Sequence, residues 1–251
     1  MRSLLFLEVI GSGTLFFSGC NLRCKFCQNY KISWECKGKE ISIEELAKKM
    51  LWLQKEGANN INLVTAFMFV PQIIEAIRIA KNDGLDIPLV YNTSGYESVE
   101  TLKLLDGIVD IYLPDFKYFY NELGENLSGV KDYYEVASKA IDEMKRQQPV
   151  NIIDDGIMQK GVIIRHLVLP NHIQNSKQVL KYLKKKYGKD VQVSIMAQYF
   201  PEYKAKECED INRKLTQEEF DEIESFVYKI GLENGYIQYL EDDEAQYVPD
   251  F

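Results

Sequence analysis

The sequence has no long hydrophobic run and no opening segment typical of a signal peptide. No apolar stretch approaches the roughly 20 residues that a transmembrane helix needs, so we expect no membrane contact. Residues 1–7 are mildly apolar, but Glu8 interrupts them too early for the apolar core of a signal peptide. We expect this opening segment to form an edge strand.

The chain also lacks blocks of basic residues. Its formal net charge is −8, and its largest basic run is the three lysines at 184–186. We place these lysines on the solvated face of a helix near its C-terminus, where cations are favoured. An acidic chain of this kind is a poor candidate for binding a phosphate backbone, so we expect no nucleic-acid partner.

Cysteines are few, and their number, five, is odd. In a chain of 251 residues this count argues against a disulfide framework and for a reducing compartment, so we predict a cytoplasmic protein. Cys36 and Cys208 stand apart from the other three cysteines. We expect both to be free structural thiols.

The sequence shows no internal repeat, no low-complexity tract and no interdomain linker. It therefore fits a single domain spanning residues 1–251, with a core at about 11–240. We expect the acidic tail, residues 241–251, to be frayed. The polar, glycine-containing segment 147–160 is predicted to be a long mobile loop.

Strand and helix patterns alternate along the chain. Six segments have the composition of strands, at 14–17, 61–64, 88–91, 108–113, 162–168 and 191–196. Helices are expected after Ser42, from Pro71, at 98–105, 132–146 and 176–187, and after Thr216. Ser42 and Thr216 are each followed three residues later by a glutamate, which is the capping-box pattern. Because parallel strands need helical crossovers, these six units predict an α/β fold with a parallel sheet, either doubly wound or a partial barrel.

Three of the cysteines stand close together, in the arrangement Cys20-x-x-x-Cys24-x-x-Cys27. A tetrahedral zinc site or an electron-transfer iron–sulfur cluster takes four protein ligands. Three thiolates around a cluster of four irons leave one iron without a protein ligand, and that iron can bind a small molecule. The alternative is a structural zinc or electron-carrying site in which Cys36 or Cys208 supplies a fourth ligand.

Polar side chains follow the end of every predicted strand. The carboxyl ends of parallel strands meet at one edge of the sheet, where functional residues collect. In chain order these residues are Cys20, Cys24, Cys27, Thr65, Asn92, Thr93, Asp115, Lys117, Arg165 and Gln198. Such a rim is typical of an enzyme built from strand–helix units.

The cysteine motif, with Phe26 before its last cysteine and Asn29 two residues after it, resembles the radical S-adenosylmethionine enzymes. The chain looks most like their glycyl-radical-enzyme activating branch, which includes pyruvate formate-lyase activating enzyme and uncharacterised relatives. The resemblance covers about residues 11–240 and extends to segments 11–14, 91–96, 110–117, 164–170 and 196–201. It implies a partial (β/α)6 barrel of the TIM type, with parallel strands.

The resemblance also implies a mechanism. Cys20, Cys24 and Cys27 would hold a [4Fe–4S] cluster whose open iron chelates S-adenosylmethionine. The reduced cluster would pass one electron to the sulfonium, and the resulting 5′-deoxyadenosyl radical would abstract hydrogen from a substrate. A flavodoxin or a ferredoxin is the electron donor that the family leads us to expect.

Cofactor contacts are expected at the other rim residues by the same resemblance. The predicted set is Asn29, Thr65, Asn92, Thr93, Asp115, Lys117, Arg165 and Gln198. Oxygen ligands there would suit a monovalent cation, and the Arg165 guanidinium suits carboxylate recognition. The alternatives are a strand-end ion pair between Asp115 and Lys117, a rim salt bridge for Arg165 and a structural hydrogen bond for Gln198. His166 alternates away from Arg165 along the strand, so we expect it to pack outward against a helix.

Two departures from the family pattern affect the prediction. Residues 65–68, Thr-Ala-Phe-Met, stand where the activase-like subgroup has a Thr-Pro-Thr-His-type segment and many other members have a Gly-Gly-Glu-like one. Only Thr65 matches, so the apolar rim puts the substrate in doubt, although backbone carbonyls there could still accept the protons of the cofactor amine. Longer subgroup members carry a cysteine-containing N-terminal segment, whereas 19 residues precede Cys20 here, as in a short or truncated variant.

Three functional hypotheses follow. The first is a radical S-adenosylmethionine oxidoreductase that acts on a glycine of a partner enzyme. The second is a radical enzyme with a small-molecule or peptide substrate, because membership of a subgroup does not fix function. The third is a non-catalytic protein, either an iron–sulfur or zinc protein or a barrel that binds its partner without turnover, which the apolar residues 66–68 would fit.

Overall fold

The computed structural model describes residues 11–232 and 234–238. The predicted N-terminal edge strand and the predicted frayed tail lie outside the described residues. One sheet contains all the described strands, in the order β1-β2-β3-β4-β6-β7-β8, and β5 pairs with β6 alone. The strands are β1 (Gly13–Phe16), β2 (Ile61–Val64), β3 (Leu89–Thr93), β4 (Ile111–Pro114), β5 (Ile152–Asp154), β6 (Ile157–Leu167), β7 (Gln192–Met196) and β8 (Gly235–Gln238).

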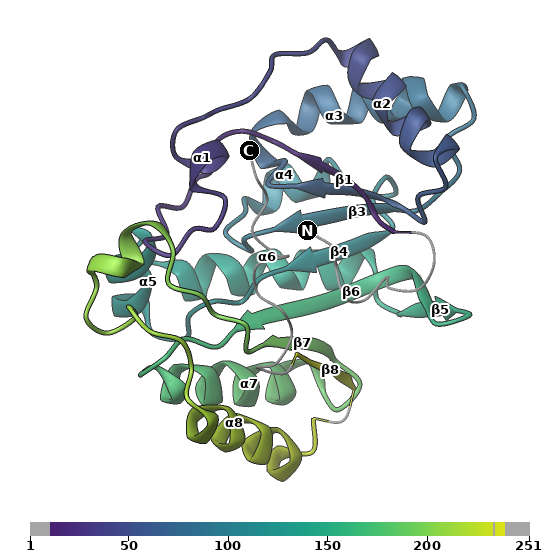
Figure 1. The fold of residues 1–251 in the computed structure, drawn as a ribbon. Coiled ribbons are helices and arrows are strands. Elements are labelled where there is room, and N and C mark those ends of the chain that lie inside the picture. Colours follow the sequence, from purple (N-terminus) through teal and green to yellow (C-terminus); the bar gives the residue numbers. More distant parts are fainter. Residues whose placement is uncertain (1–10, 233, 239–251) are drawn as a thin grey trace.

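Every pairing along this order is parallel, and helices surround the outside of the curved sheet (Figure 1). The helices are α1 (Tyr30–Ser33), α2 (Ile43–Lys55), α3 (Val70–Asn82), α4 (Val99–Lys103), α5 (Asn121–Ser128), α6 (Tyr133–Gln147), α7 (Ile173–Tyr187) and α8 (Gln217–Ile230), with short 3₁₀ helices η2 (Phe67–Phe69) and η3 (Tyr203–Glu207). The predicted α/β fold, a partial TIM-type barrel with parallel strands, is confirmed.

The strands and helix starts predicted from short sequence patterns agree with the structure. The six predicted strands correspond to β1, β2, β3, β4, β6 and β7. Ser42 caps α2, its hydroxyl accepting a hydrogen bond from the Glu45 amide (3.1 Å). At the start of α8, the Thr216 hydroxyl accepts from the Glu219 amide (3.2 Å) while the Glu219 carboxylate accepts from the Thr216 amide (3.0 Å). These helices therefore begin where short-range hydrogen bonding dictates.

The prediction of a mobile loop at 147–160 is wrong. This segment holds the last residue of α6 and an antiparallel hairpin of β5 with the start of β6. Asp155 and Gly156 form the turn with φ angles of 46° and 76°, the backbone that a two-residue hairpin needs. The Asp-Gly pair was the available sequence signal. The sequence analysis also missed α5 and β8.

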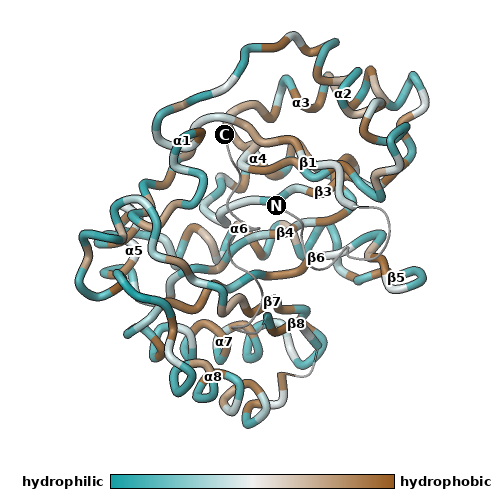
Figure 2. The backbone as a smooth tube through the Cα atoms, in the orientation of Figure 1, coloured by the Kyte–Doolittle hydropathy of each residue, from teal (hydrophilic) through white to brown (hydrophobic). Residues whose placement is uncertain are grey.

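Alternate residues of the central strands face different cores. Tyr91 of β3 and Tyr112 of β4 belong to the main core with the helices, whereas Val90 and Ile111 belong to a second cluster together with Ile163 of β6. This alternation is the two-residue period of a strand buried on both faces. Figure 2 shows the result: hydrophobic colour is concentrated on the strands and on one side of the helices.

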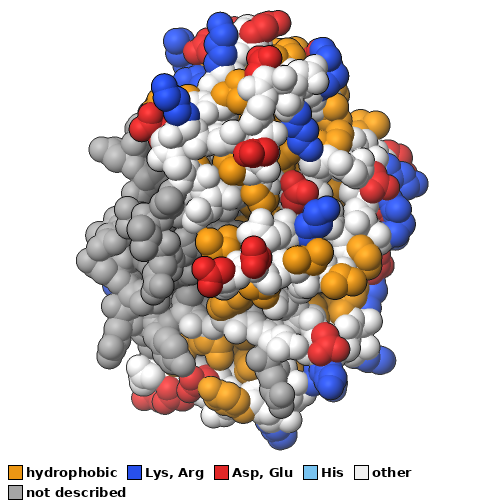
Figure 3. Space-filling view, turned by 90° about the vertical axis from the view of Figure 1, so that its right-hand side faces the viewer, with side chains coloured by type: hydrophobic (Ala, Val, Ile, Leu, Met, Phe, Trp, Pro, Cys, Tyr) orange, Lys and Arg blue, Asp and Glu red, His pale blue; other side chains and the backbone are white. Residues whose placement is uncertain are grey.

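The two ends of the barrel differ. The strands run toward the side of Figure 1 where α1 and α5 lie, and the segments after β1, β2, β3, β4 and β7 meet there. Figure 3 shows the opposite side, where acidic and basic side chains are interspersed with hydrophobic ones. Among the described helices, none has the length and apolar character that crossing a bilayer requires.

The loop between β3 and α4 approaches the end of β4 closely. Gly95 has a φ of +78°, and a Cβ there would lie 2.0 Å from the Asp115 carbonyl oxygen. In the same loop, Glu97 is buried and accepts hydrogen bonds from the hydroxyls of Thr93 and Tyr91. Burial raises the pKa of this carboxyl from 4.5 to about 7. The loop is therefore fixed by one steric requirement and one buried acid.

The variant Gly95→Ala tests the steric requirement against a matched control, Gly107→Ala. Gly107 has nearly the same φ, +73°, but a Cβ there meets nothing within 4 Å. We expect Gly107→Ala to lower the free energy of unfolding by about 1–2 kcal/mol, the cost of left-handed backbone alone. Gly95→Ala should cost roughly another 1–3 kcal/mol because its methyl overlaps a backbone carbonyl. Urea denaturation measures both, and equal losses would contradict the account.

The variant Glu97→Gln tests the buried acid. Because burial raises the pKa of Glu97 from 4.5 to about 7, the folded protein keeps a proton that the unfolded chain has released in this window. The free energy of unfolding should therefore fall as pH rises through it, by about 3 kcal/mol at most. We expect Glu97→Gln to lose less stability than the parent between about pH 5 and about pH 8. Urea denaturation at both pH values measures this loss. If the parent and Glu97→Gln lose the same free energy of unfolding between them, Glu97 does not titrate in this range.

Candidate active site

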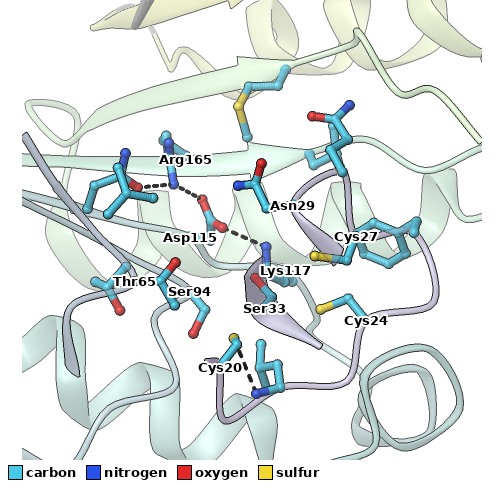
Figure 4. Close-up of a pocket in the computed structure, with 18 of the residues that line it drawn as sticks. Cys20, Cys24, Cys27, Asn29, Ser33, Thr65, Ser94, Asp115, Lys117 and Arg165 are labelled. Carbon is cyan, nitrogen blue, oxygen red and sulfur yellow. Dashed lines mark hydrogen bonds and ion pairs between the residues drawn. The ribbon is translucent and has the colours of Figure 1, made fainter. Parts of the chain in front are cut away.

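The C-terminal ends of the strands surround one pocket (Figure 4). All eleven residues predicted for the site line it: Cys20, Cys24, Cys27, Asn29, Thr65, Asn92, Thr93, Asp115, Lys117, Arg165 and Gln198. They are far apart in the chain, and they meet because most of them follow or end a different parallel strand. The fold thus brings the predicted set together, while the role of each residue remains a prediction.

The pocket also contains residues outside the predicted set of site residues. Polar groups come from Gln28, Ser33 and Ser94, and apolar surface comes from Leu22, Phe26, Val64, Leu167, Met196, Tyr199 and Phe200. Most of these apolar residues belong to strands or to the segments that follow them. From composition alone, apolar residues in such segments are predicted to be part of the hydrophobic core. Their place in the pocket wall depends on tertiary structure.

Backbone hydrogen bonds hold the cysteine loop against the end of α5. The amide of Arg23 donates to the carbonyl of Ser128 (2.9 Å), and the amide of Lys25 donates to the carbonyl of Leu127 (2.8 Å). Leu22, between the first two cysteines, is buried and belongs to the main core. The loop is therefore anchored on both sides, which fixes the direction of its cysteine side chains.

The three thiols lie in the pocket wall as free cysteines. Burial raises the pKa of Cys20 to about 11 and that of Cys27 to about 12, and it also raises the pKa of Cys24. Without a ligand these groups are neutral thiols near pH 7. Metal ligation requires the thiolates, so binding of a metal group here releases protons.

The three cysteines of the pocket are not grouped as the ligands of a single metal ion are. Throughout residues 11–232 and 234–238, no three His, Cys, Asp or Glu side chains are grouped so that they could hold one metal ion. Cys20, Cys24 and Cys27 nevertheless share one pocket. Cys36 is exposed and Cys208 lies elsewhere, and neither is among the residues of this pocket. The structure therefore does not support Cys36 or Cys208 as a fourth ligand.

A partly buried ionic network forms the wall facing the cysteines (Figure 4). The Asp115 carboxylate lies 2.5 Å from Lys117 Nζ and 2.8 Å from Arg165 Nη2. Arg165 Nη2 also donates to Asn92 Oδ1 (2.7 Å). Burial pushes the pKa of Asp115 upward, but Arg165 and Lys117 together outweigh it, so this pKa lies below its ordinary value. The ion pairs considered for these residues from the sequence are therefore present, and they do not exclude a cofactor contact.

Tyr133 joins the ends of two strands. Its hydroxyl lies 2.8 Å from the Ser94 carbonyl oxygen and 3.0 Å from the Asp115 carbonyl oxygen, and it accepts from the Lys117 amide (3.0 Å). The side chain is fully buried. Nothing near Tyr133 in the sequence indicates that α6 brings its hydroxyl to the backbone of pocket residues Ser94, Asp115 and Lys117.

The segment after β2 has unusual backbone geometry. Thr65 has a φ of +58°, a region that costs a β-branched residue about 1–3 kcal/mol and occurs mainly at functional sites. Its amide donates to the Asn92 carbonyl (3.0 Å), which fixes it beside the end of β3. Ala66 is buried and Met68 is 54% exposed. Of residues 65–68 only Thr65 lines the pocket, so the apolar residues expected at this rim are not part of the pocket wall.

Three further predictions have clear positions. Gln198 is buried, and its Oε1 has no hydrogen-bond partner among the described residues, which leaves that atom available to a ligand. The side chain of Asn29 points into the pocket (Figure 4).

His166 packs outward as expected: its ring nitrogens bond to the Phe116 carbonyl (2.7 Å) and to Ser176 Oγ of α7 (2.8 Å). Burial lowers the pKa of His166 to about 4, so it is a neutral structural residue.

Sequence comparisons identify relatives. Residues 14–162 match the family model of the Radical SAM superfamily. The chain is 36% identical over 236 residues to Uncharacterized protein MJ0674 of Methanocaldococcus jannaschii, covering 91% of this chain and 65% of that protein. It is 24% identical over 177 residues to the pyruvate formate-lyase-activating enzyme of Clostridium pasteurianum, covering 66% of each. The chain thus spans just under two thirds of the length of these relatives.

Solved structures share the fold. Streptococcus suis SuiB bound to S-adenosylmethionine aligns with a TM-score of 0.59 and 12% identity, covering 92% of this chain and 52% of that one. The structure of anSMEcpe with bound AdoMet aligns with a TM-score of 0.60 and 18% identity, covering 91% and 64%. At these identities the likeness concerns the fold alone. Since the family model covers more than half of the sequence and includes the three-cysteine motif, this chain belongs to the Radical SAM superfamily.

Proposed function

We propose that this protein is a radical S-adenosylmethionine enzyme. The observation that carries the proposal is one pocket in which three thiols face a partly buried ionic network at the C-terminal ends of parallel strands. Cys20, Cys24 and Cys27 would hold a [4Fe–4S] cluster with one open iron. When bound, the cluster supplies one electron to S-adenosylmethionine, whose cleavage gives a 5′-deoxyadenosyl radical that takes hydrogen from a substrate.

The chain's own residues would bind and orient the cofactor. The Arg165 guanidinium and the Lys117 ammonium are the cations of the wall, and either suits the cofactor carboxylate. Asn92, Thr93 and the unpaired Gln198 oxygen add polar partners for the rest of the cofactor. A monovalent cation is not part of the proposal, because Asp115 is already neutralised by two cationic side chains.

The apolar part of the wall would exclude water from a reactive intermediate. Phe26, Leu167, Met196 and Phe200 line the pocket beside the polar groups. A site closed by such side chains strengthens the interactions inside it and protects a radical from side reactions. The barrel end thus combines charged groups for binding with apolar groups for protection.

For the substrate, we propose only the class of molecule that donates the hydrogen. The similarity to the Clostridium pasteurianum activating enzyme favours a glycine of a partner protein as the hydrogen donor. A peptide or small molecule is the second candidate, favoured by the shared fold with SuiB, which has been solved bound to precursor peptide SuiA. A flavodoxin- or ferredoxin-type electron donor and a cytoplasmic location complete the proposal, and the free cysteines agree with a reducing compartment.

Anaerobic reconstitution with iron and sulfide tests the proposed function. We expect the reduced protein to convert S-adenosylmethionine to 5′-deoxyadenosine, and single Cys20→Ala, Cys24→Ala or Cys27→Ala variants to fall to the background rate because each loses a cluster ligand. Cys36→Ala and Cys208→Ala are the matched controls, and both should retain cluster and product.

Two results would contradict the proposal. The first is an intact cluster in the parent protein with no 5′-deoxyadenosine, as in a barrel that binds without turnover. The second is loss of the cluster in Cys36→Ala or Cys208→Ala, which would mean that a fourth cysteine closes the site.

A further inference from the structure

The end of α5 lies directly behind the cysteine loop. Gly129, with a φ of +75°, ends the helix, and its amide donates to the Glu125 carbonyl (3.1 Å). The carbonyls of Leu127 and Ser128 accept from the amides of the loop, as described above. The side chain of Ser128 is thereby held next to a cysteine by hydrogen bonds that its own backbone makes.

Two hydroxyls form a chain that ends on a cysteine sulfur. Ser128 Oγ lies 3.0 Å from Cys24 Sγ, and the Tyr118 hydroxyl lies 2.7 Å from Ser128 Oγ. Both Ser128 and Tyr118 are fully buried, so water does not compete for these bonds. We call Tyr118, Ser128 and Cys24 the hydroxyl relay.

Ligation fixes the direction of the relay. A ligating thiolate carries no proton and can only accept, so the one hydroxyl proton of Ser128 must point at Cys24 Sγ. The Ser128 oxygen is then free to accept, and the Tyr118 hydroxyl, protonated at neutral pH, donates to it. Donation by Tyr118 polarises the Ser128 hydroxyl and strengthens its bond to the sulfur.

The other two sulfurs have weaker or different partners. Cys20 Sγ accepts from the Leu22 amide at 3.5 Å, a long contact. The Ser33 side chain and the Asn29 backbone both act on Cys27 to lower its pKa, and both residues line the pocket. Cys24 is therefore the sulfur whose donor lies behind the pocket wall, since neither Ser128 nor Tyr118 is among the residues that line it.

We propose that Ser128 and Tyr118 are positioning residues that set the reduction potential of the cluster through Cys24. The inference rests on the proposed function. Reduction adds one electron, supplied by a one-electron reductant, and makes the cluster more negative without forming or breaking a bond in the protein. A hydrogen bond donated to a ligating sulfur stabilises that extra charge, so the relay makes reduction easier.

The test is an EPR-monitored redox titration of the reconstituted full chain. We expect Ser128→Ala to shift the midpoint potential to a more negative value, because the sulfur loses its donor. Tyr118→Phe keeps the Ser128 donor but removes its polarising partner, so it should shift the potential in the same direction by a smaller amount. Thermal melting monitored by circular dichroism reports any loss of fold separately.

Tyr112→Phe is the matched control. Tyr112 is also fully buried, and its hydroxyl bonds to Gln147 of α6, on the helix side of β4 and away from the cysteines. Like Tyr118→Phe, this variant removes one buried tyrosine hydroxyl. Any general effect of such a removal on the potential would therefore also be seen in Tyr112→Phe. Its midpoint potential should equal that of the parent.

The outcomes separate the inference from the proposed function. A parent protein that binds no cluster contradicts the proposed function itself. A cluster whose potential is unchanged in Ser128→Ala overturns the relay and leaves the proposed function standing. If Ser128→Ala retains no cluster, Tyr118→Phe decides: a negative shift supports the relay, and a potential equal to that of the Tyr112→Phe control overturns it.

Discussion

The pocket depends on one partly buried carboxylate, that of Asp115. Asp115 contacts both cations of the wall, and removing the carboxylate would leave the two positive charges without their shared partner. Its backbone is equally constrained, since the amide donates to the Thr93 carbonyl (2.9 Å) and the carbonyl leaves no room for a side chain at Gly95. The ends of β3, β4 and β6 therefore meet at this residue.

The same constraint links the ionic wall to the cysteines. Asp115 holds Lys117, whose positive charge acts on both Cys20 and Cys24 and favours their thiolate forms. Burial opposes ionisation of these thiols and outweighs that attraction, so the site is neutral until a metal group takes the protons' place. A pocket with soft ligands on one side and fixed charges on the other is suited to binding a charged cofactor beside a metal group.

Sequence predicted the parts of this arrangement that are local. Strand composition gave the parallel sheet, and the residue types after each strand gave the pocket wall. The elements that were not predicted depend on contacts between residues far apart in the chain. One is α5, which contains Gly124, a poor helix former, at a point where a Cβ would lie 3.1 Å from the Tyr133 side chain. The roles of Tyr133, Ser128 and Glu97 follow from what the fold places beside them, which no spacing in the chain encodes.

The central claim is that three cysteines hold a cluster with an open iron that S-adenosylmethionine occupies. EPR spectroscopy of the reduced, reconstituted protein tests this most directly, because the spectrum of the cluster responds to a new ligand on one of its irons. The account predicts that adding S-adenosylmethionine changes the spectrum of the parent protein and of Cys36→Ala in the same way. A spectrum that S-adenosylmethionine leaves unchanged, in a protein with a full complement of iron, would contradict it.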